Sequence, residues 1–165
     1  MLPYTVRRTD DRGFTMLELG FVLMIVGILA AIAIPSFITS INKSQASDAL
    51  DRVRGALQES QREAIRKSKT CTVNIPKGDN KTISGTCLVT GERTLTGINI
   101  DYSNTAPLSI TFDFKGRTND VSSSGTIKIA STNGSIKEKK CLVISQGLGI
   151  IRTGNYTGTT CESSR

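Results

Sequence analysis

The chain has 165 residues, the length of one small domain, and carries 21 basic and 14 acidic residues for a formal net charge of +7. It contains no histidine, which excludes Ser-His-Asp and Cys-His catalytic arrangements, and it has no Gly-x-x-x-x-Gly-Lys phosphate loop. The positive surplus favours contact with polyanions, although it is also ordinary for a soluble exported domain. We therefore expect a protein that is not an enzyme.

An apolar segment dominates the N-terminal part of the chain. Residues 16–34 contain one charge, Glu18, and at ~1.5 Å per residue a helix of this length nearly spans a bilayer core. Three arginines precede the segment, whereas the next basic residue after it is Lys43. The positive-inside bias therefore predicts a single-pass protein in the inner (cytoplasmic) membrane, with everything beyond the segment exported.

Glu18 needs an explanation, because a carboxylate at the centre of a membrane helix costs ~2.5–3.5 kcal/mol. Residues 13–18, Gly-Phe-Thr-Met-Leu-Glu, stand before an uninterrupted apolar run that ends at Pro35. This pattern resembles the N-terminal signal of the type IV pilins and the type II secretion pseudopilins. The resemblance implies that a prepilin peptidase cuts after Gly13, that Phe14 is then N-methylated, and that Glu18 pairs with the N-terminal amine of a neighbouring subunit during assembly.

Two other interpretations of the N-terminal segment remain open. An ordinary secretory signal also has a basic leader and an apolar run, and Ala31-Ile32-Ala33 would serve as its cleavage site. A simple uncleaved anchor would require neither the glycine at the start of the apolar run nor the acid five residues later.

The helical period continues beyond Pro35. Pro35 itself removes a backbone donor, so it predicts a kink or local melting of the helix. Apolar residues then recur at steps of three and four up to about residue 67, which predicts an amphipathic helix; they are Ile38, Ile41, Ala46, Ala49, Leu50, Val53, Leu57, Ala64 and Ile65. The mixed charges on the opposite face are typical of a solvated surface, with fibre contacts as the alternative.

Short β-like runs separated by turn residues fill the remaining chain. We expect strands at 71–75 and 86–90, joined as a hairpin, and further strands at 97–102, 108–114, 125–130, 141–145 and 149–152. The predicted fold is α+β: a long N-terminal helix packed on an antiparallel sheet or pair of sheets. The resemblance divides it into a leader (1–13), a transmembrane assembly helix (14–35), an amphipathic helix (36–67) and a β-rich globular domain (68–165).

Four cysteines lie in the exported part, where an oxidising compartment lets disulfides persist. Of the three pairings, the spacings favour two local loops, Cys71–Cys87 and Cys141–Cys161. The second bridge would hold the tail from 153 to 165, which is otherwise expected to fray. Without histidine or Cys-x-x-Cys spacing we expect no metal and no cofactor, and the acids near Asp79 and from Asp113 to Asp120 lack the alternation of a calcium loop.

The order of residues from Phe112 to Ser145 resembles the globular domain of FimT/GspH-type minor pilins and pseudopilins. In FimT proteins that bind DNA, a Gly-Arg-x-Arg in the last turn contacts phosphate, and the matching run here, residues 149–152, keeps only Arg152. The candidate DNA contacts are Lys137, Lys139, Lys140 and Arg152. A solvated turn is the other interpretation of these cations.

The resemblance implies a minor pilin or pseudopilin, a structural subunit of a type IV pilus or a type II secretion pseudopilus. Its partners would be the prepilin peptidase, other pilin or pseudopilin subunits, the inner-membrane assembly platform and the membrane. A DNA-binding minor pilin for DNA uptake and the main fibre subunit are the alternatives.

Overall fold

A computed structural model describes residues 13, 15–102, 108–118, 125–132 and 139–163. The leader residues 1–12 and Phe14 lie outside the described residues. Two compact units make up the chain, Met1–Ile38 and Thr39–Arg165.

One long helix, α1 (Met16–Arg66), begins in the first unit and ends in the second. It confirms the predicted helix. The helix continues through Pro35, so of the two effects expected at this proline, local melting does not occur. From Ala46 to Ala64 the predicted apolar face is buried, but Ile38, Ile41 and Ile65 are exposed.

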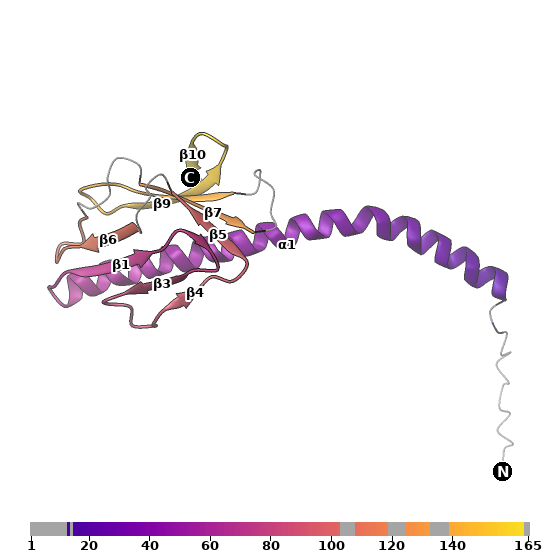
Figure 1. Cartoon of the computed structure of the whole chain (residues 1–165), viewed down its shortest axis with the longest axis horizontal. Helices are drawn as coiled ribbons and strands as arrows, with labels where there is room; N and C mark the ends of the chain where they lie inside the picture. The colour runs from indigo at the N-terminus through magenta and orange to yellow at the C-terminus, as the bar shows by residue number, and fades with distance from the viewer. Residues whose placement is uncertain (1–12, 14, 103–107, 119–124, 133–138, 164–165) are drawn as a thin grey trace, which may run out of the picture. The chain divides into compact units, whose positions relative to one another are not determined.

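Two antiparallel sheets make up the rest of the second unit and pack on the C-terminal part of α1 (Figure 1). The first sheet has the order β4-β3-β1-β6, with the bounds β1 Cys71–Ile75, β3 Thr82–Gly85, β4 Arg93–Thr94 and β6 Leu108–Phe112. The second has the order β10-β9-β8-β7-β5-β2, with the bounds β2 Gly78–Asp79, β5 Ile98–Asp101, β7 Thr126–Ser131, β8 Lys140–Ile144, β9 Ile151–Tyr156 and β10 Cys161–Ser163. The α+β prediction is confirmed.

The strand predicted at 86–90 is wrong. The residues that pair with β1 are those of β3, with Val73 opposite Gly85, and the chain turns after residue 85. The short strands β2 and β4 were not predicted, and β9 begins later and runs further than the predicted 149–152. The tail is ordered by β10, which pairs with β9.

The core lies where the inner faces of both sheets meet α1. Strands alternate between buried and more exposed residues, as in β7, where Ile127 and Ile129 are fully buried and Lys128 lies on the other face. Apolar residues from the buried face of α1 pack into the same core, among them Val53 and Leu57. This packing fixes which turns reach the C-terminal end of α1.

Candidate functional site

The first candidate surface is the beginning of α1. Thr15 caps the helix: the Glu18 amide donates to Thr15 Oγ1 at 3.2 Å, and the Leu19 amide donates to the Thr15 carbonyl at 3.1 Å. Glu18 thus lies in the first helical turn, where the helix dipole favours a negative charge, and it is exposed.

Beyond Glu18, the first unit presents apolar side chains to its surroundings. None of its described residues is buried, and among the described residues α1 is the helix long and apolar enough to cross a membrane. Large apolar residues more than half exposed include Leu17, Phe21, Leu23, Met24, Leu29 and Ile32. Such a surface is costly in water, so it needs a membrane or packed partners around it.

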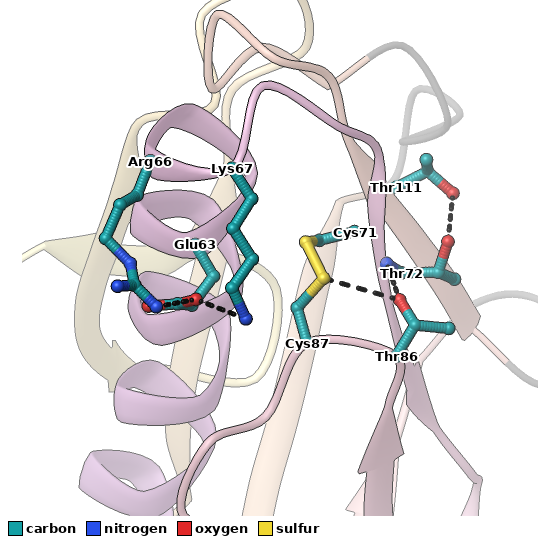
Figure 2. Close-up of a disulfide and its surroundings, with 8 residues drawn as sticks. All are labelled: Glu63, Arg66, Lys67, Cys71, Thr72, Thr86, Cys87 and Thr111. Atoms are coloured by element: carbon teal, nitrogen blue, oxygen red, sulfur yellow. Dashed lines mark hydrogen bonds and ion pairs between the residues drawn. A yellow bond between two sulfur atoms is a disulfide. The ribbon is translucent and has the colours of Figure 1, made fainter.

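Both predicted disulfides are confirmed, Cys71–Cys87 and Cys141–Cys161. The register that places Val73 opposite Gly85 places Cys87 opposite Cys71, so the first bridge continues the pairing where the ladder ends. Figure 2 shows this bridge beside the hydroxyl of Thr86, which accepts the amide of Thr72 at 3.0 Å. The second bridge joins β8 to β10 and holds the tail.

The candidate DNA contacts do not share one face of the second sheet. Lys140 is opposite Asn155 and Ile129 on the side that faces α1, and its Nζ donates to Asn155 Oδ1 at 2.7 Å. Arg152 is opposite Val143, one residue out of phase with Leu142, and therefore lies on the outer side. Lys139 precedes β8, and Lys137 lies outside the described residues.

A junction of three segments forms at the C-terminal part of α1. The Gln61 side-chain amide donates to the Gly116 carbonyl at 2.7 Å and to the Gly149 carbonyl at 3.2 Å. Gly116 and Gly149 both have positive φ, 74° and 65°, in the turns that follow β6 and β8. The Gly147 amide donates to the Thr118 carbonyl at 2.7 Å and ties the same turns together. One helix residue thus fixes two turns that are distant in sequence.

Asp113 organises the first of these turns. Its carboxylate accepts the amides of Lys115 (2.9 Å) and Arg117 (2.8 Å), and it forms an ion pair with the Arg117 guanidinium at 2.9 Å. The hydrogen bond from the Arg117 amide lowers the pKa of Asp113 below its usual 3.8, and the other donors add to this effect. Partial desolvation acts in the opposite direction but is outweighed. The turn therefore keeps a fixed shape at neutral pH.

A second clamp joins α1 to the loop that follows Cys87. Arg93 donates to the Glu59 carboxylate at 2.6 Å and to the Arg52 carbonyl at 2.8 Å, and Thr90 donates to Glu59 through its amide and hydroxyl. Burial opposes ionisation of Glu59, but the Thr90 hydrogen bonds and the Arg93 charge outweigh it and lower its pKa below 4.5. Gly55 leaves room for Arg93, because a Cβ there would lie 2.7 Å from Arg93 Nη1.

No group of three or more His, Cys, Asp or Glu side chains that would suit a metal occurs among the described residues. The polar side chains at Asp79 and Asn80 have internal partners. Asp79 accepts the Asn99 amide at 2.6 Å, and Asn80 accepts the Gly97 amide at 2.6 Å. Asp120 lies outside the described residues.

Comparison with known proteins found similar structures and short similar stretches of sequence. No family model matches the chain. The structure is similar to the type IV minor pilin FimU of Pseudomonas aeruginosa in two crystal forms, with TM-scores of 0.54 and 0.51 and identities of 16% and 17%. The similar region covers 73% and 72% of this chain and 95% and 98% of FimU.

Among curated proteins, the chain is 56% identical over 39 residues to the type IV major pilin protein PilA of Myxococcus xanthus. It is 46% identical over 45 residues to the fimbrial protein EcpC of Eikenella corrodens. These matches cover 24% and 27% of this chain, but only 18% and 29% of the relatives' own lengths. A short part of the chain is therefore similar in sequence to a type IV major pilin and a fimbrial protein, and the structure has the fold of the minor pilin FimU.

Sequence reasoning about this chain missed the junction at Gln61. A signal was available, because Gln61 falls four residues after Leu57 and four before Ile65, on the apolar face of the predicted helix. A polar residue on such a face needs buried partners. The helix residue that holds the turn after β6 was therefore not identified from the sequence.

Proposed function

We propose that this chain is a minor pilin, a structural subunit that assembles through α1 into a type IV pilus fibre. The exposed apolar surface of the first unit carries this proposal, because it has the length of a membrane span and needs neighbours once it leaves the bilayer. FimU, whose fold the chain shares, is a type IV minor pilin. A type II secretion pseudopilus subunit is the second form of the same proposal.

Processing and assembly follow from the same segment. The prepilin peptidase would cut after Gly13, and Phe14 would become the methylated N-terminus. Glu18 would then pair with the terminal amine of a neighbouring subunit, because two opposite charges that meet in an apolar surrounding offset each other's desolvation. The globular unit would lie outside the inner membrane, where its disulfides form. Its partners would be the peptidase, the assembly platform and other pilins.

The test of processing compares two glycines. Neither Gly13 nor Gly20 has an atom within 4 Å of where a Cβ would lie, so a larger side chain clashes at neither position. Intact mass of the wild-type protein from cells with the peptidase should show loss of residues 1–13 and gain of one methyl group. Gly13→Leu should keep the leader, and Gly20→Leu should lose it. A mass that begins at residue 34 would mean an ordinary secreted protein.

The test of assembly uses sheared fibres. Wild-type protein should be present there in small amount beside a more abundant pilin, whereas Glu18→Gln should stay in the membrane with its leader removed. The isosteric change removes only the charge, so it separates ion pairing from packing. A fibre made mainly of this chain would identify it as the main subunit, and equal incorporation of Glu18→Gln would refute the role of Glu18.

A further inference from the structure

Four large apolar side chains lie exposed around the Gln61 junction. Their exposed fractions are 51%, 53%, 67% and 45%; they are Ile65, Phe114, Leu148 and Ile150, and we call them the turn patch. They belong to the second unit, so membrane insertion of the first unit does not account for them. Single exposed apolar residues are ordinary, but a group on adjoining segments marks an interaction site.

Printed contacts bring the three segments of the turn patch together. A Cβ at Gly116 would lie 2.8 Å from Ile65 Cδ1, and a Cβ at Gly149 would overlap the Gly116 carbonyl. Phe114 is two residues from Gly116, and Leu148 and Ile150 flank Gly149. The four residues therefore lie on three segments that meet where Gln61 donates to both turns.

The turn patch is held in place before any partner binds. Gln61 and Asp113 fix the backbone of the turns, and the Lys115 ammonium lies 5.4 Å from the centre of the Phe114 ring. A surface that is already ordered in the free protein loses less conformational entropy on binding. This favours a partner with a complementary fixed shape, such as a protein surface, over a fluid bilayer.

Among the described residues of the two turns and β9, the more exposed charges near the turn patch are basic. Lys115 and Arg117 come from its first turn, and Arg152 is exposed two residues after Ile150. The nearby acid, Asp113, is 27% exposed, and its oxygens are occupied by Arg117 and two backbone amides. The rim is therefore cationic. Two copies meeting through this patch would place like charges together, which argues against self-association.

We propose that the turn patch docks a different protein whose contact surface has apolar residues at its centre and acidic residues around them. Phe114 and Leu148 would supply the buried centre of the interface, since large exposed side chains on a rigid base give the most contact area. Lys115 and Arg152 would pair with the partner's carboxylates at the rim and fix its orientation. The inference does not depend on fibre assembly through α1.

The test places a photoreactive residue in the full chain, in the cells that produce it. Leu148→p-benzoylphenylalanine should give one discrete adduct with another protein after illumination. The matched control is the same change at Val89, which is 68% exposed on the loop whose Thr90 contacts Glu59 and not Gln61, and it should not give that adduct. Mobility on a non-reducing gel should show both disulfides formed in each variant, as a check on folding.

Two further variants decide the chemistry. Lys115→Glu combined with Arg152→Glu should lower the adduct yield at least fivefold, and Phe114→Ser should do the same without changing charge. The peptide crosslinked to position 148 should contain aspartate or glutamate beside apolar residues, and changing those acids to lysine should restore the yield in the charge-reversed variant. The proposal would be overturned if position 148 gave no adduct, if position 89 gave an equal adduct, or if the yield did not respond to charge reversal. It would also be overturned by an adduct with a second copy of the chain, with lipid or with nucleic acid.

Discussion

The junction at Gln61 makes a sharp prediction about two glycines in one turn. Gly147 and Gly149 both have positive φ, 80° and 65°, so alanine at either position pays a conformational cost of about 1–2 kcal/mol. A Cβ at Gly147 meets nothing within 4 Å, whereas at Gly149 it would overlap the Gly116 carbonyl and lie 2.9 Å from Gln61 Nε2. Only Gly149→Ala should break the junction.

The added cost at Gly149 has two sources. Moving the Gly116 carbonyl and Gln61 apart loses hydrogen bonds worth about 1 kcal/mol each, and forcing an extra methyl group into a packed site costs about 1–3 kcal/mol. We expect Gly149→Ala to lower the free energy of unfolding by about 4–7 kcal/mol and Gly147→Ala by about 1–2 kcal/mol. At roughly 4 °C per kcal/mol, the two melting temperatures should differ by about 12–20 °C.

The assay is thermal unfolding of the oxidised full chain in detergent, followed by near-ultraviolet circular dichroism, which reports packing of the globular unit. Gln61→Ala should lower the melting temperature as well. In that background Gly149→Ala should cost less than in the wild type, because the hydrogen bonds of Gln61 are already lost and only the backbone and Gly116 overlap costs remain. Equal shifts for Gly147→Ala and Gly149→Ala would refute the argument that the crowded junction, and not backbone conformation, makes Gly149 necessary.

Three other predictions concern the second unit. Arg93→Ala should destabilise it by about 2 kcal/mol by leaving the half-buried Glu59 without its charged donor, while Arg62→Ala, exposed beside it, should change stability little. Replacing Cys141 and Cys161 by serine should cost on the order of 3 kcal/mol for the loop they close, and amide exchange should accelerate first in β10. The pKa of Asp113 is lowered in the folded protein, so its contribution to stability is fully present above pH 3.8 and is lost as the pH falls through the pKa of the folded state. The amide resonances of Lys115 and Arg117, which donate to this carboxylate, should shift at that same pH. In Asp113→Asn they should not shift.

The mistaken strand at 86–90 shows where local patterns fail. Residues 86–90, Thr-Cys-Leu-Val-Thr, have a high β propensity, but the hydrogen-bonding edge of β1 is taken by residues 82–85. After Gly85 the chain turns away from β1, and Thr90 then donates to Glu59 on α1. Tertiary contacts outweighed propensity over these few residues.

The sequence by itself determined the features that depend on near neighbours: the helix from its three- and four-residue period, most strands from alternation, and the disulfide pairs from their spacing. Only the tertiary structure decided which turns meet at Gln61 and that Lys140 and Arg152 lie on opposite faces of one sheet. Register is the physical reason, because a shift of one residue turns a side chain from one face of a sheet to the other. That choice is made by partners far away in the chain.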